Sequence, residues 1–280
     1  MNTKIVTDSC ADLPIELVEK YNISVVPLEV RFNDKAYVDG VDLSSKEFYD
    51  MMKSHKDLPK TASPSPEQFI NEFEGPEDHI IVVTISSGLS STYNSALLAK
   101  DIYEKSNKNK KIYIIDSLSA SVGEGLVVLK TAQMLQSGIK INELIDIANK
   151  CAQEVQVYFM LETLENIVKG GRIDKVTGQL ASILSIKLIM KSDGNGVVDL
   201  AEKARGSKKA FNRLVDIIGE NGANLENRIL GIAHANCYDK ALEYKKMIEA
   251  KYNFKDIIIS TIGATIGTYS GEGGLLIAVL

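Results

Sequence analysis

The chain has 280 residues, of which 45% are hydrophobic and 25% charged, and its formal net charge is −5. This length suits one large domain or two ordinary ones with a sizeable core, and the regular apolar blocks argue against disorder. The mildly acidic balance argues against a nucleic-acid groove, and the longest apolar runs fall far below the ~20 residues of a membrane span. We therefore expect a soluble protein that binds no nucleic acid and has no integral membrane segment.

The cysteines and histidines argue against disulfide bonds and metal sites. The three cysteines are far apart, which leaves neither a disulfide framework nor a CxxC metal site. None of the three histidines stands at metal-ligand spacing from another histidine or a cysteine. Strand-like sequence begins by Lys4, which leaves no room for a signal peptide. We expect a cytoplasmic protein without a metal site.

The first half of the chain alternates short β-rich runs with helical stretches. We expect strands at residues 4–7, 23–30, 79–85 and 111–115, and helices at residues 13–21, 90–105, 119–136 and 142–154. The isoleucine and valine runs are continuous, as a parallel sheet covered on both faces requires. Residues 1–154 are therefore predicted to form an N-terminal α/β domain with a parallel sheet.

The second half has a different pattern. We expect strands at residues 155–161, 228–234, 256–260 and 275–280, and helices at residues 164–169, 180–186, 207–219 and 239–251. Residues 187–191 lead to an Asp-Gly-Asn-Gly turn at residues 193–196, which indicates a hairpin of antiparallel strands. This mixed connectivity predicts a C-terminal α+β domain, residues 155–280, and a boundary near residue 155.

Motifs of enzymes that act alone are missing. The chain has no GxxxxGK[ST] loop and no GxGxxG after a strand, and residues 88–92 lack the last glycine of a GxSxG elbow. His55 and His79 are expected to be exposed, whereas His234 ends an apolar strand and is expected in the core or an interface. A self-sufficient nucleotide enzyme is therefore disfavoured.

Two loops carry an unusual number of hydroxyl groups. The first, residues 60–69, contains an N-cap candidate at Ser65 followed by Pro66, and the second, residues 85–93, leads from a buried strand into a helix. Free backbone amides, a positive helix end and several hydroxyls would then meet at the carboxyl edge of the sheet. Simple capping explains part of this pattern, but the hydroxyls exceed what two caps need. We predict an anion site made from Thr61, Ser63, Ser90, Ser91 and Thr92.

Other polar positions leave two interpretations open. The pairs Asp8-Ser9 and Asp116-Ser117 each end a strand, where they could belong to a site or cap the next helix. Arg172 follows two glycines and Arg205 precedes a Gly-Ser helix start; each could be solvated, or both could accept a phosphate-bearing partner. The glycine-rich residues 262–274 could let the backbone approach a ligand closely or form a plain turn.

The sequence resembles the DegV family along essentially the whole chain. The matching segments, in chain order, are residues 7–13, 61–66, 85–93, 170–173 and 266–271. The resemblance implies two α/β domains with a long-chain fatty acid buried between them and its carboxylate held by hydroxyls. The family includes the fatty-acid-binding subunit of bacterial fatty acid kinase. The resemblance therefore implies a carrier without catalytic residues or a cofactor of its own, whose ligand an ATP-binding kinase subunit phosphorylates for phospholipid synthesis.

The family motifs imply roles for particular residues. Thr61, Ser63 and the loop with Ser90, Ser91 and Thr92 would hold the carboxylate, and Thr268 and Tyr269 belong to the C-terminal motif of the same site. Arg172 and Arg205 would face the partner and its phosphate. Ser91 stands where the family usually has glycine, and Tyr269 stands where it usually has histidine. A tyrosine can donate a hydrogen bond to a carboxylate but cannot carry a positive charge.

Two alternative functions stay open from the residues. One is a hydrolase or transferase for a small carboxylate with Ser90 as nucleophile, which needs a base within ~3 Å that the sequence does not supply convincingly. The other is an apolar-ligand sensor without a kinase partner. The carrier is favoured because burying ~15 methylenes at ~0.8 kcal/mol each gives an upper bound near ~12 kcal/mol, and hydroxyls can match the carboxylate.

Overall fold

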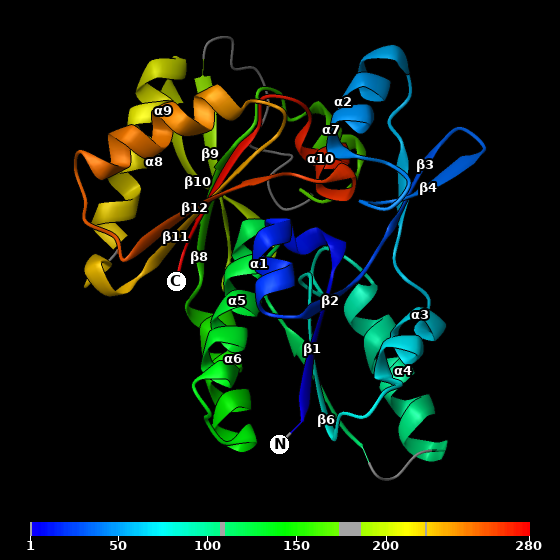
Figure 1. Cartoon of the computed structure of the whole chain (residues 1–280). Helices are drawn as coiled ribbons and strands as arrows, with labels where there is room; N and C mark the ends of the chain where they lie inside the picture. Colours follow the sequence, from blue (N-terminus) through cyan, green and yellow to red (C-terminus); the bar gives the residue numbers. More distant parts are fainter. Residues whose placement is uncertain (1, 107–109, 174–185, 222) are drawn as a thin grey trace.

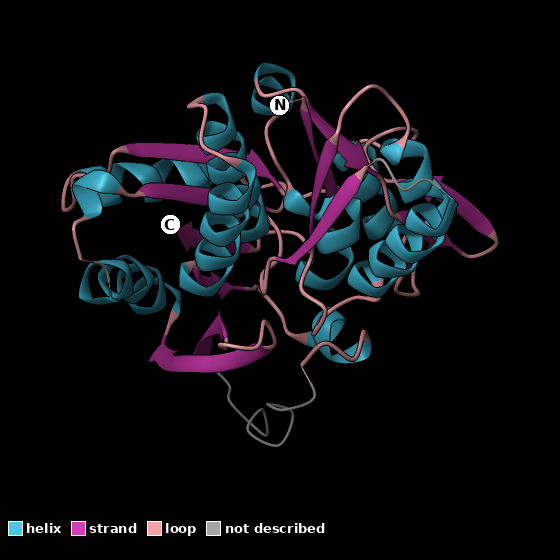
Figure 2. Ribbon diagram, turned by 90° about the horizontal axis from the view of Figure 1, so that it is seen from below, coloured by secondary structure: helices cyan, strands magenta, loops and turns pink. Residues whose placement is uncertain are grey.

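The N-terminal half of the chain contains a parallel sheet between two helical layers (Figures 1 and 2). The structure is a computed structural model that describes residues 2–106, 110–173, 186–221 and 223–280. The sheet has the order β2-β1-β6-β7, with β1 (Thr3–Asp8), β2 (Ile23–Val26), β6 (His79–Thr84) and β7 (Lys111–Asp116). One face packs on α3 (Pro66–Phe73) and α4 (Thr92–Ser106), and the other packs on α5 (Val122–Gln136) and α6 (Ile141–Glu154). Every residue of β6 is buried, as its continuous apolar run predicts.

The C-terminal half contains a six-stranded mixed sheet of order β10-β9-β8-β13-β11-β12. Its strands are β8 (Gln156–Met160), β9 (Ile186–Ser192), β10 (Val198–Arg205), β11 (Ile229–His234), β12 (Asp256–Thr261) and β13 (Leu275–Val279). Among these six described strands only β11 and β12 pair in parallel, and the predicted hairpin joins β9 to β10. Two helices, α8 (Ser207–Asn221) and α9 (Tyr238–Glu249), cover one face. The protein is therefore an α/β protein with a parallel and a mixed sheet; the domain division at residue 155 stays a prediction.

The helix α5 lies between the two large sheets (Figure 1). Leu126 and Leu129 pack in the cluster of the mixed sheet, whereas Val127 and Val128 pack in that of the parallel sheet. All residues from Val122 to Leu129 are buried, as expected of a helix that packs between two sheets. Gly231 on β11 lets α5 come close, because a Cβ there would collide with Val122. The two halves thus share one helix as a common layer.

A small third sheet was not expected from the sequence. It has the order β4-β3-β5, and its neighbours include α2 (Ser45–Ser54) and α10 (Ala264–Ser270). Its strands are β3 (Glu29–Phe32), β4 (Lys35–Val38) and β5 (Lys60–Ala62). The single strand predicted at residues 23–30 is wrong, because β2 ends before Pro27 and β3 begins in this other sheet. Proline has no N–H for a sheet ladder, which favours the break at this point.

The glycine-rich C-terminal segment forms the helix α10 and not the loop that its composition suggested. Side chains distant in sequence bind its first amides: Gly263 N donates to Asp12 Oδ1 at 2.8 Å, and Ala264 N and Thr265 N donate to Asp39 at 3.0 and 2.9 Å. Gly267 lets α10 pack on α2, since a Cβ there would lie 2.6 Å from a ring carbon of Phe48. Tertiary contacts therefore create this helix.

The remaining short elements are α1 (Ile15–Lys20), α7 (Glu165–Lys169) and the 3-10 helices η1 (Ser9–Ala11) and η3 (Leu225–Asn227). Most of the helix predicted at residues 180–186 lies outside the described residues. Among the helices that the structure describes, none combines the length and the hydropathy that crossing a membrane needs.

Candidate functional site

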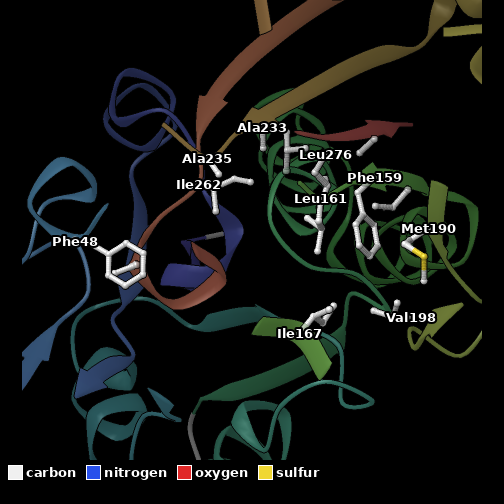
Figure 3. Packing of buried hydrophobic residues seen from close by; sticks show 14 of the residues in the cluster. Phe48, Phe159, Leu161, Ile167, Met190, Val198, Ala233, Ala235, Ile262 and Leu276 are labelled. Carbon is white, nitrogen blue, oxygen red and sulfur yellow. The ribbon is translucent and has the colours of Figure 1, made fainter. Parts of the chain in front are cut away.

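A largely apolar cavity lies where the three sheets and α10 meet. It contains about 920 Å³ of space not occupied by protein atoms, counting its open mouth. Figure 3 shows six of its apolar lining side chains, which come from β8, α7, β10, β13 and the segments beside them: Phe159, Leu161, Ile167, Val198, Ile262 and Leu276.

One part of the cavity wall is polar. The hydroxyls of Thr61 on β5 and Tyr269 on α10 are 2.6 Å apart, so one donates to the other. The Arg172 guanidinium lies 4.8 Å from the centre of the Tyr269 ring and donates to the carbonyls of Gly170 and Leu89. All three side chains line the cavity. A cation stacked on an aromatic ring beside two hydroxyls is a suitable environment for an anion.

The two hydroxyl-rich loops meet, as the sequence predicts. Ser63 Oγ lies 3.1 Å from Ser90 Oγ and 2.7 Å from Ser91 Oγ, and Ser90 Oγ lies 2.9 Å from Thr92 Oγ1. Of these four residues Ser90 lines the cavity, Thr92 is buried where α4 begins, and Ser91 is exposed. Ser65 forms a capping box with Gln68 on α3. The hydroxyl chain therefore runs from the surface to the cavity wall.

Two sequence-predicted residues lie elsewhere. Thr268 is buried on α10, and its hydroxyl donates to Ala264 O of the same helix at 2.9 Å; it is not part of the cavity lining. Arg205 is exposed at the far end of the eight-residue strand β10, whose first residue, Val198, lines the cavity. At ~3.3 Å per residue these ends are roughly 23 Å apart along the strand. Arg172 is half-buried in the cavity wall, and the expectation that both arginines face a partner stays a prediction.

The histidines offer no base for Ser90 in the described chain. The hydroxyl partners of Ser90 are Ser63 and Thr92, and no described histidine, aspartate or glutamate lines the cavity. His79, expected to be exposed, is only 8% exposed because it begins the central strand β6. His55 is half-buried, and His234 is buried as expected, which lowers its pKa.

Buried acidic residues behind the cavity were not found from the sequence as a group. Asp8 accepts hydrogen bonds from Cys10 N and Ile85 N, both at 2.9 Å, and burial raises its pKa to about 6. Glu124 accepts a hydrogen bond from Thr7 Oγ1 at 3.0 Å, and burial raises the pKa of its carboxyl well above the usual range. Burial likewise raises the pKa of Asp12. Isolated acidic residues next to apolar ones are the only sequence signal for this cluster.

The strand-end aspartates hold loops together. Asp8 joins the ends of β1 and β6, and Asp116 Oδ1 accepts hydrogen bonds from Ser87 N at 3.1 Å and Leu118 N at 3.0 Å. Of the two interpretations of these residues, the geometry favours the structural one. The described residues also contain no group of three or more histidine, cysteine, aspartate or glutamate side chains suited to a metal ion.

Comparisons with known proteins agree on one family. The family model described as "Uncharacterised protein, DegV family" matches residues 2–280. A DegV-family protein from Ruminococcus gnavus, refined with vaccenic acid, is 32% identical with a TM-score of 0.93, and the match covers 99% of each chain.

Two further solved structures are similar over nearly their whole length. DegV from Bacillus subtilis, described as a fatty acid binding protein, is 31% identical with a TM-score of 0.88, covering 100% of this chain and 99% of that one. The Fatty Acid Kinase (Fak) B3 protein of Streptococcus pneumoniae, loaded with linoleic acid, is 31% identical with a TM-score of 0.88, covering 99% of each chain.

Proposed function

The chain belongs to the DegV family, and on that premise we propose that it binds one long-chain fatty acid in the cavity between its sheets. The observation that carries the proposal is the placing of Thr61, Tyr269 and Arg172 together in the wall of an otherwise apolar cavity. A carboxylate enters such a cavity only if donors replace its water, whereas an acyl chain gains free energy from the apolar walls.

The orientation of the ligand follows from this polarity. The carboxylate accepts hydrogen bonds from Thr61, Tyr269 and Ser90 and pairs with Arg172. The acyl chain then runs along the apolar walls that include Phe159 and Leu276. Thr268 has no place in this arrangement because its hydroxyl is engaged within α10.

We further propose that the protein is a carrier subunit and that an ATP-dependent kinase phosphorylates the bound carboxylate. The chain of hydroxyls from Ser90 in the cavity wall to the exposed Ser91 supports this role, because a partner could reach the polar end of the cavity from the surface. The similarity to the Fatty Acid Kinase (Fak) B3 protein of Streptococcus pneumoniae supports the same role. The acyl phosphate would serve phospholipid synthesis in the cytoplasm, where ATP is available. Arg205 lies away from the cavity, so in this arrangement it contacts the kinase and not the ligand.

The binding proposal is tested with two ligands that differ only at the head group. The delipidated chain is titrated with stearic acid and with stearyl alcohol, using displacement of a fluorescent fatty acid as the readout. A hydrogen bond to a charged group contributes about 1.5–3 kcal/mol, so the acid should bind about 10-fold more tightly or better. Equal affinities, or no binding of either ligand, would contradict the proposed site.

The carrier proposal needs a second assay. The loaded protein is incubated with ATP and a purified kinase subunit of a bacterial fatty acid kinase, and acyl phosphate is trapped with hydroxylamine. Product should form only when both proteins are present. Fatty acid binding without any transfer by a kinase proven active on its own carrier would favour the sensor function instead.

A further inference from the structure

The two glycines before Arg172 have different structural roles. Both follow α7, which ends at Lys169. Gly171 has a φ of +69° and open space around it, so it ends the helix in the left-handed conformation that glycine adopts easily. Gly170 has a φ of −75° and a ψ of −10°, which other residues adopt as readily. The backbone conformation therefore does not explain why residue 170 is a glycine.

A close contact between α7 and α10 does explain it. The two helices lie side by side (Figure 1), and a Cβ at Gly170 would lie 2.5 Å from both Cδ1 and Cε1 of Tyr269. Carbon atoms that are not bonded to each other stay about 3.5 Å or more apart. Residue 170 therefore has to be a glycine for the ring of Tyr269 to lie where it does.

The same glycine also supports the guanidinium that stacks on this ring. Gly170 O accepts a hydrogen bond from Arg172 Nη1, and the guanidinium lies 4.8 Å from the centre of the Tyr269 ring. Arg172 Nε also donates to Leu89 O at 3.3 Å, which holds the guanidinium in the cavity wall. Packing of this kind limits the rotamers that a side chain can adopt. Gly170 and Arg172 therefore both restrict the position of the Tyr269 ring.

The position of the ring determines where its hydroxyl lies. Tyr269 Oη is 2.6 Å from Thr61 Oγ1 in the cavity wall, where the proposed carboxylate binds. A methyl group on residue 170 would push the ring about 1 Å away, and the hydroxyl at the tip of the ring would move at least as far. Hydrogen bonds from a hydroxyl to a carboxylate span only about 2.5–2.7 Å, so this displacement breaks them.

We propose that Gly170 is a positioning residue that gives the cavity its preference for ionised fatty acids over uncharged lipids of the same chain length. This inference rests on the proposed fatty acid site and names the residue that sets its ligand class. In the part of the chain that the structure describes, Gly170 does not itself line the cavity, so it acts through Tyr269. An alcohol gains less from the Tyr269 hydroxyl than a carboxylate does, because its oxygen carries no charge.

Stearic acid and stearyl alcohol test this inference in the wild type and in Gly170→Ala. The selectivity, defined as the Kd of the alcohol divided by that of the acid, should fall at least about fivefold in Gly170→Ala. The Kd of the alcohol should stay within about twofold of the wild type, which also shows that the variant is folded. Gly171→Ala is the matched control, because a Cβ there meets open space. It should keep the wild-type selectivity although its φ makes the variant less stable.

A second background separates positioning of the hydroxyl from other effects. Tyr269→Phe lacks the hydroxyl, so adding Gly170→Ala to it should change the selectivity by less than about twofold. The inference is overturned if Gly170→Ala keeps the wild-type selectivity, if it weakens both ligands equally, or if it lowers the selectivity as much in the Tyr269→Phe background. A wild type that does not prefer the acid, or that binds neither ligand, would instead overturn the fatty acid site itself.

Discussion

The contact between Thr61 and Tyr269 gives the sharpest test of the carboxylate site. Their hydroxyls are 2.6 Å apart in the cavity wall, and either atom can be the donor. When a carboxylate binds, both hydroxyls can turn to donate to it, so their mutual bond is exchanged for two charge-assisted bonds. We expect Thr61→Val and Tyr269→Phe, which remove one hydroxyl each at nearly constant shape, to weaken fatty acid binding without unfolding the protein.

The magnitude follows from the bonds that are lost. A hydrogen bond to a charged group contributes about 1.5–3 kcal/mol, which corresponds to about 10- to 150-fold in Kd. Each single variant also removes the mutual bond in the free protein, which lowers the cost of binding and moves the expected effect toward the smaller value. Because both hydroxyls serve one carboxylate, the double variant should depart from additivity by at least about 0.5 kcal/mol.

The assay is isothermal titration of the delipidated variants with one long-chain fatty acid. Thr268→Val is the control, since it makes the same chemical change one residue from Tyr269 at a hydroxyl that donates to Ala264 O. Its Kd should stay within about twofold of the wild type. Unchanged Kd values for both Thr61→Val and Tyr269→Phe would refute the assignment of the carboxylate to this part of the wall.

Three further changes test the fold and the charges. Gly196→Ala should lower the free energy of unfolding by about 2–4 kcal/mol, because φ is +73° and a Cβ would lie 2.8 Å from the Cα of Leu118. Gly194→Ala is the control, because a Cβ there has open space, and it should have little effect in the same chemical denaturation. Burial raises the pKa of Glu124, so the folded state holds a proton that the unfolded chain releases. The wild type should therefore lose stability relative to Glu124→Gln as the pH rises from about 5 to 8, as measured by urea unfolding across that range. Arg172→Ala should weaken fatty acid binding at least about fivefold, because the guanidinium lines the cavity, while Arg205→Ala should leave the Kd unchanged.

A different result in each of these three experiments would contradict the structural reason given for it. Equal destabilisation by the two glycine substitutions would mean that the hairpin turn does not pack as described. A stability difference between the wild type and Glu124→Gln that does not vary with pH would mean that this carboxyl keeps an ordinary pKa. Weaker fatty acid binding in Arg205→Ala would indicate that this arginine takes part in ligand binding.

Much of the parallel sheet could be predicted because its signal is local. The continuous isoleucine and valine runs of β6 and β7 predict buried parallel strands, and the turn at residues 193–196 predicts the β9–β10 hairpin. The break at Pro27 was missed because two strands of different sheets follow each other within one apolar stretch. Such a change of sheet depends on partners that are far away in the sequence.

The proximity of the hydroxyl-rich loops could be predicted from the sequence, whereas the binding roles of their residues stay a prediction. The two hydroxyl loops could be paired because both stand beside helix starts, and the structure joins them through Ser63. The helix α10 could not be predicted, because Asp12 and Asp39 bind its first amides from more than two hundred residues away in the chain. Arg205 is grouped with Arg172 in the sequence because both arginines stand next to glycines at the ends of elements, and this pattern does not show which of them lines a cavity.

Native mass spectrometry of the freshly purified chain tests the central claim most directly. We expect a species heavier than the 30.7 kDa chain by the mass of one long-chain fatty acid, which organic solvent releases unchanged. Detection of the bare chain alone, together with no uptake of added fatty acid after delipidation, would contradict the proposed fatty acid binding.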